Sequence, residues 1–119
     1  MRTSQKKLSS KEEKRIKLEF ATLLTDIKNP NEMIEFLDSF LKENEFLGLS
    51  KRASVIRLLS KGCSYEMVQK TLNVSSATVS SIANFGNEKI LAKIIQKFEV
   101  DDWAGRLAKK IIGFFPIRT

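Results

Sequence analysis

Apolar residues recur every three or four positions along most of the chain, which is the spacing of α-helices with one buried face. Pro30, Gly62 and Gly86 interrupt this pattern, and no stretch keeps the two-residue period of a β-strand. We therefore predict an all-α protein with two short helices inside residues 64–84 and five others, covering about residues 10–28, 30–41, 44–60, 88–98 and 101–112. We expect Ser10 and Glu13 to form a capping box, and Asp101 or Asp102 to cap the last helix.

The stretch 64–84 has the spacing of a helix-turn-helix. With Tyr65 as the first position, apolar residues occupy positions four, eight, ten, fifteen and eighteen, which are Val68, Leu72, Val74, Val79 and Ile82. Asn73, at position nine, tolerates the left-handed backbone that a tight turn requires. Ser64 and Ser75 are suited to cap the two helices. The alternative interpretation is an ordinary helical hairpin in a bundle.

The second helix of this stretch has a face of small polar side chains. Such a helix can lie close to base edges in a major groove. The side chains on this face are Ser76, Thr78, Ser80, Ser81 and Asn84. The preceding long helix has a basic side, for which phosphate contact and simple solvation are equally good interpretations; its residues are Lys51, Arg52, Arg57 and Lys61.

The net charge of +7 is unevenly distributed. Residues 1–17 carry +5 and residues 49–97 carry +6, whereas residues 18–48 carry −5. Basic blocks around a candidate helix-turn-helix are typical of nucleic-acid binding, although a solubilising tail with scattered lysines would give the same total. The acidic helices could also receive the basic segment 1–9, which we interpret as a flexible arm. Deleting that arm would then raise DNA affinity.

Other classes of function have little support in the sequence. Cys63 is the single cysteine and histidine is absent, so we expect no disulfide, metal site, cofactor or catalytic centre. No run reaches the length of a membrane span, and no apolar run follows the basic N-terminus as in a secretory signal. These features favour a cytoplasmic protein that is not an enzyme.

Three runs around the motif carry a resemblance to a known family. They are LLSKGCSY at 58–65, VSSATVS at 74–80 and NFGN at 84–87. They resemble the bacterial tryptophan-repressor superfamily, most closely its YerC/YecD-type branch, over about residues 15–90. The resemblance implies a TrpR-like intertwined homodimer that binds double-stranded DNA and regulates transcription. It also adds Ala77 to the candidate base-contacting residues.

Two departures from the family pattern affect ligand and base recognition. The arginines that sandwich the indole in the tryptophan repressor correspond to Lys51 and Ser81, and a small glycine corresponds to Ile82, so we expect no tryptophan binding. The second helix also lacks Lys and Arg, so its base discrimination would be modest. Affinity would then depend on phosphate contacts, for which the candidates are Lys51, Arg52, Arg57, Lys61, Ser64, Lys70, Ser75 and Lys89.

The wide apolar faces of the predicted helices favour a homodimer. We expect a TrpR-like helical domain over residues 10–112 and an apolar tail over 113–119. The leading hypothesis is a DNA-binding regulator of transcription. The alternative is a protein-protein interaction module in which the helix-turn-helix is only structural.

Overall fold

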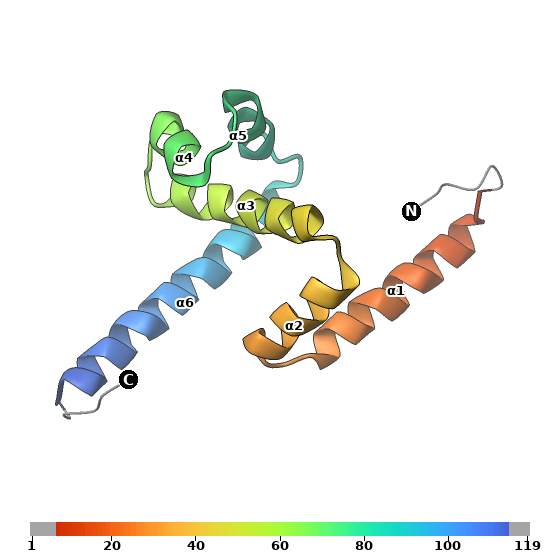
Figure 1. The fold of residues 1–119 in the computed structure, drawn as a ribbon, viewed down its shortest axis with the longest axis horizontal. Helices are drawn as coiled ribbons and strands as arrows, with labels where there is room; N and C mark the ends of the chain where they lie inside the picture. The colour runs from red at the N-terminus through yellow and green to blue at the C-terminus, as the bar shows by residue number, and fades with distance from the viewer. Residues whose placement is uncertain (1–6, 115–119) are drawn as a thin grey trace. The chain divides into compact units, whose positions relative to one another are not determined.

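The computed structural model describes the backbone of residues 7–114 and the side chains of residues 7–107. Over this range it contains six α-helices and no strand, which confirms the all-α prediction. The helices are α1 (Ser10–Asp26), α2 (Pro30–Phe40), α3 (Glu43–Ser60), α4 (Tyr65–Leu72), α5 (Ser76–Ala83) and α6 (Glu88–Phe114) (Figure 1). The predicted arm lies outside the described residues except for 7–9. The predicted tail also lies outside them, except that the backbone of 113 and 114 continues α6.

The chain forms two compact units, Met1–Phe46 and Leu47–Thr119. In the first, α1 and α2 are joined by a short turn in which the side chain of Asn29 caps α2 and Pro30 opens it. The ring of Phe40 stacks on Phe20 of α1 and on Phe36 of α2, with centroids 5.6 and 5.1 Å apart. Phe36 and Phe40 therefore lie on one aromatic face of α2, one turn apart.

The cap of α1 is one residue earlier than predicted. Ser9 is the N-cap, and its hydroxyl accepts a hydrogen bond from the backbone N–H of Glu12 at 3.1 Å. The predicted pair, Ser10 and Glu13, lies inside the helix. Both registers match the capping-box pattern, because serines stand at 9 and 10 and glutamates at 12 and 13.

In the second unit, α3, α4 and α5 enclose a small core. Val55, Val68 and Val79, one from each helix, are fully buried. Half-buried side chains pack around them; these are Leu58, Leu59, Cys63, Leu72, Val74 and Ile82. All five apolar positions predicted for the stretch 64–84 therefore belong to this core or pack against it. Val55 is not among the residues that the spacing of helix 44–60 placed on its apolar face, which were Phe46, Leu49, Ala53, Ile56 and Leu59.

Two left-handed residues set the path of the chain around α4. Gly62 has φ +89° and follows the end of α3, where the N–H of Cys63 donates to the carbonyl of Leu58 at 3.1 Å. Asn73 has φ +53° and ends α4, as the sequence predicted. With only Asn73, Val74 and Ser75 between α4 and α5, the two helices lie close together beside α3 (Figure 1).

The prediction of two helices after residue 88 was wrong. α6 is continuous from Glu88 to Phe114, so neither Asp101 nor Asp102 is a cap. No Gly or Pro stands between Phe98 and Asp101, and nothing else there prevents the helix from continuing. Asp102 instead pairs with Arg57 of α3 and with Lys61, which follows the end of that helix.

Candidate nucleic-acid interface

The candidate interface is built on the N-terminal caps of α4 and α5. The hydroxyl of Ser64 accepts a hydrogen bond from the N–H of Met67, and that of Ser75 accepts one from the N–H of Thr78, each at 3.1 Å. These bonds satisfy amides that a helix start leaves unpaired. They place both predicted phosphate-contact serines at helix starts, where the helix dipole also favours an anion.

The face of α5 opposite its buried residue Val79 is exposed. The exposed side chains on α5 are the predicted set Ser76, Ala77, Thr78, Ser80 and Ser81. Asn84, also predicted to contact bases, is the C-cap of α5, and its Nδ2 donates to the carbonyl oxygen of Ser80 at 2.9 Å. The structure therefore separates Asn84 from the others, because its amide is directed toward its own helix.

Two basic side chains of α3 lie beside this face. Lys51 and Arg52 line a hollow of about 440 Å³ together with Gly48 of the same helix. The opposite wall comes from α5 and the turn before it, and consists of Val74, Ala77, Thr78, Ser81 and Ile82. The structure thus brings two phosphate-contact candidates next to three base-contact candidates. Gly48 was not predicted to line a site, because a glycine inside a helix indicates only a position that weakens the helix.

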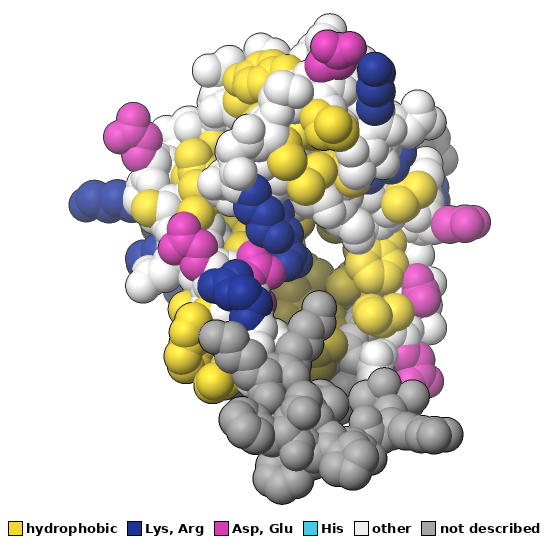
Figure 2. All heavy atoms as spheres, turned by 90° about the vertical axis from the view of Figure 1, so that its left-hand side faces the viewer, with side chains coloured by type: hydrophobic (Ala, Val, Ile, Leu, Met, Phe, Trp, Pro, Cys, Tyr) yellow, Lys and Arg dark blue, Asp and Glu magenta, His cyan; other side chains and the backbone are white. Residues whose placement is uncertain are grey.

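Arg57, in the last turn of α3, and Lys61, just after the end of this helix, have a different environment. Arg57 forms an ion pair with Asp102 of α6 and lies over the ring of Phe98, 5.4 Å from its centroid. Lys61 pairs with the other oxygen of Asp102 at 3.4 Å. We call Arg57, Lys61 and Asp102 the α3–α6 charge cluster. Figure 2 likewise shows basic and acidic side chains close together near the middle of the face that it presents.

The remaining predicted phosphate contacts are scattered. Lys70 on α4 pairs with Glu66 at 3.3 Å, and both side chains are about three-quarters exposed, so this pair adds little stability. Lys89 is exposed in the first turn of α6. Neither residue lines the hollow between α3 and α5.

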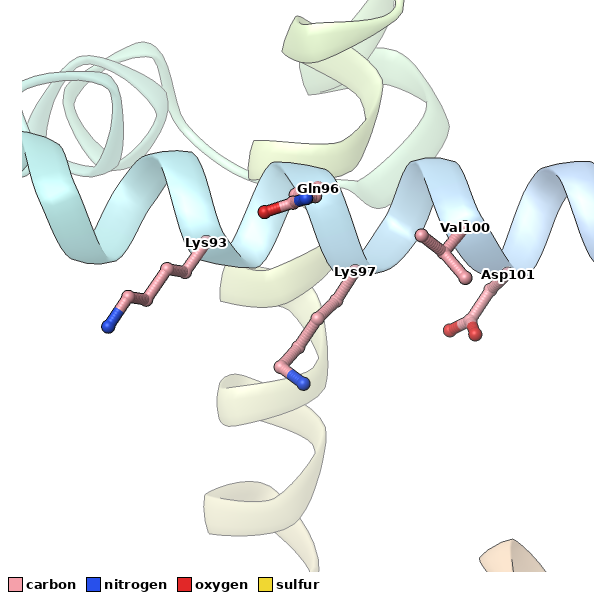
Figure 3. A pocket seen from close by; sticks show the side chains of 5 residues that line it. All are labelled: Lys93, Gln96, Lys97, Val100 and Asp101. Atoms are coloured by element: carbon pink, nitrogen blue, oxygen red, sulfur yellow. The ribbon is translucent and has the colours of Figure 1, made fainter.

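A second hollow, of about 540 Å³, lies along α6 and is lined by one helix alone. Its residues are Lys93, Gln96, Lys97, Val100 and Asp101. Figure 3 shows Lys93, Lys97 and Asp101 pointing to the same side of α6 while α3 crosses behind it. With no second element facing these side chains, the surface has no wall opposite to hold a small ligand.

Comparison with known proteins identifies the family. Residues 17–107 match the family model described as Trp repressor protein. The chain belongs to the Trp repressor family. A curated relative, the uncharacterized protein YerC of Bacillus subtilis (strain 168), is 31% identical over 68 residues. That similarity covers 55% of this chain and 65% of the relative's length. No solved structure matches the chain significantly.

For a Trp repressor family member, the composition of the hollow between α3 and α5 is informative. The three positions that the resemblance placed at the indole site, Lys51, Ser81 and Ile82, all line this hollow. Ile82 also packs against the valine core. Over residues 7–107, no group of three or more potential metal ligands occurs. No described helix is long and apolar enough to span a membrane.

Proposed function

We propose that this Trp repressor family member is a DNA-binding regulator of transcription, in which α4 and α5 form a helix-turn-helix and α5 enters the major groove. The observation that carries the proposal is the exposed face of α5, with Val79 buried behind it and Ser76, Ala77, Thr78 and Ser80 outward. Small side chains let a helix approach base edges closely. The cations of Lys51 and Arg52 lie beside this face, where they can neutralise backbone phosphates.

We further propose that the protein acts as a homodimer. Only four hydrophobic residues are buried among the described side chains, namely Val55, Ile56, Val68 and Val79. Large apolar side chains remain exposed on three other helices, including Ile16, Phe20 and Leu23 of α1, Ile34 and Phe40 of α2, and Ile90, Trp103 and Leu107 of α6. Such surfaces are typical of chains that are completed by a partner. A two-fold axis would present two copies of α5 to successive major grooves.

Tryptophan is not part of the proposed mechanism. An indole needs flat, rigid neighbours and an open space between them. The hollow beside α5 offers a flexible Lys51 ammonium and a short Ser81 hydroxyl, and Ile82 adds bulk where the family's glycine leaves room. We therefore expect duplex binding that does not change when tryptophan is added.

Selection of genomic DNA fragments on the purified protein, followed by anisotropy titration at low and physiological salt, tests the proposal. Enrichment of a palindrome with half-sites about one helical turn apart supports a dimeric regulator. Salt-dependent binding without enrichment would replace it by non-specific DNA binding. Absence of binding even at low salt would contradict it and favour a protein-protein interaction module. The lack of Lys and Arg on α5 would then explain why the protein does not bind DNA.

A variant of α5 tests the placement of this helix. Thr78→Asp adds a negative charge to the exposed face but suits the first turn of a helix, so helicity and dimer mass should not change. We expect duplex binding to be abolished. Gln96→Asp, which adds the same charge on the exposed side of α6, should retain binding. Intact binding by Thr78→Asp would show that α5 does not lie in the groove.

A further inference from the structure

The side chain of Thr78 is held in one orientation by the cap of α5. Its Oγ1 lies 2.9 Å from the Oγ of Ser75, and its backbone N–H donates to the same Ser75 oxygen at 3.1 Å. The Cβ of threonine carries one hydroxyl and one methyl in different staggered positions. Because the hydroxyl is directed back to Ser75, the methyl is directed elsewhere, on a residue that is exposed.

The other groups of α5 discriminate poorly between bases. Asn84 could in principle pair with adenine, but its Nδ2 donates to the carbonyl of Ser80. The free hydroxyls of Ser76, Ser80 and Ser81 can each donate or accept, so they fit several base edges. Apart from these hydroxyls, the exposed side chains of α5 offer only two groups, the methyls of Ala77 and Thr78.

A methyl in the major groove distinguishes one base from the other three, because only thymine carries a C5-methyl there. We propose that α5 selects A·T base pairs by contact between the methyls of Thr78 and Ala77 and the C5-methyl of thymine. This inference rests on the proposed function and specifies the sequence class that it reads. Lys51 and Arg52, across the hollow from both residues, would hold the adjacent phosphates and fix the register of α5.

Deoxyuridine removes the thymine methyl without changing base pairing, and therefore provides the test. The probes are alternating poly(dA–dT) and poly(dA–dU), together with any palindrome selected from genomic DNA and substituted one thymine at a time. We expect the unmodified protein to bind the thymine duplexes about fourfold more tightly for each methyl contacted, as expected for burial of one methyl-sized group.

Two substitutions separate the methyl from the hydroxyl. Thr78→Ser keeps the hydroxyl bonded to Ser75 and should lose the preference for thymine over uracil that its methyl provides. Thr78→Val keeps the methyl and should retain that preference. Thr71→Ser, the same change at an exposed position of α4, is the matched control and should also retain it. Circular dichroism and sedimentation of each variant check that helix content and assembly are unchanged.

Equal affinity of the unmodified protein for thymine and uracil duplexes would overturn the inference while leaving DNA binding established. A thymine preference that persists unchanged in both Thr78→Ser and Ala77→Gly would also overturn it, because the preference would then come from duplex shape. If the unmodified protein binds none of the duplexes at low salt, the proposed function itself fails, and the inference fails with it.

Discussion

Lys51 and Arg52 in the middle of α3, and Arg57 and Lys61 at its end, are two pairs of the same composition in different surroundings. Across the part of the chain that the structure describes, no carboxylate pairs with Lys51 or Arg52, and both line the hollow beside α5. Arg57 and Lys61 share the carboxylate of Asp102, whose side chain is only 18% exposed.

The difference shows that a basic residue near a candidate interface is not automatically available to a phosphate. The α3–α6 charge cluster already pairs its two cations with a carboxylate, and Arg57 also packs over the ring of Phe98. The net charge of this cluster is lower than that of Lys51 and Arg52, because Asp102 offsets one of its two positive charges. The main effect of the cluster is to hold α6 against α3. Lys51 and Arg52 retain their full charge next to the exposed face of α5, so we assign the larger share of phosphate binding to them.

The largest expected effect is therefore in the double variant Lys51→Ala/Arg52→Ala. Loss of two phosphate contacts per protomer, and so of four per dimer, should reduce the slope of log affinity against log salt by about 4 and weaken duplex binding roughly 30-fold per protomer at 0.15 M salt. Titration of one duplex at several salt concentrations measures both quantities. Lys93→Ala/Lys97→Ala, on α6, is the matched control and should change the slope much less. Equal losses in the two variants would mean that net charge, not position, determines binding.

A smaller effect, on folding rather than binding, is expected for Asp102→Asn. Arg57 and Lys61 would lose their shared carboxylate, and because both cations are 40% or more exposed, the free energy of unfolding should fall by only about 1 kcal/mol. Urea denaturation measures this change, and Asp101→Asn, at the exposed neighbouring position, should be near neutral. A steeper salt dependence of DNA binding in Asp102→Asn would contradict the comparison, since the released cations would then be reaching phosphates.

The smallest effect should come from Arg57→Lys. The charge and the ion pair with Asp102 remain, but the planar guanidinium over Phe98 is lost, which should cost about 0.5 kcal/mol. This corresponds to a decrease of a few degrees in melting temperature. Lys61→Arg provides the reciprocal change and should leave the melting temperature unchanged or slightly raised. A loss as large as that of Asp102→Asn would indicate that the aromatic contact, not the ion pair, holds α6.

The part of the fold that could be predicted is the part whose signals are local. Val68 and Val79 were identified as core residues from their spacing, and Asn73 from the requirement for a left-handed turn residue. Caps and turns depend on residues three or four positions apart, so they can be recognised in a single sequence. The register error at Ser9 shows the limit of this approach when two adjacent serines fit the same pattern.

The features that were missed depend on contacts between distant residues. Asp102 was interpreted as a helix cap because its pairing with Arg57 bridges 45 positions and leaves no periodic trace in the sequence. Val55 was missed because the buried side of α3 is set by the α4 and α5 helices packed against it, not by the periodicity of α3 alone. The candidate site was affected in the same way, since the three cations of α3 and the adjacent Lys61 are equivalent until the position of Asp102 is known.

The three-valine core has a consequence for the order of events during biosynthesis. Val55, Val68 and Val79 come from consecutive helices, so this core requires no contact with residues that follow α5. Cores built from neighbours in the chain close quickly, and segments synthesised first can fold first. The DNA-reading module that we propose can therefore form before α6 has packed against α3 and before the surfaces assigned to the dimer have met their partner.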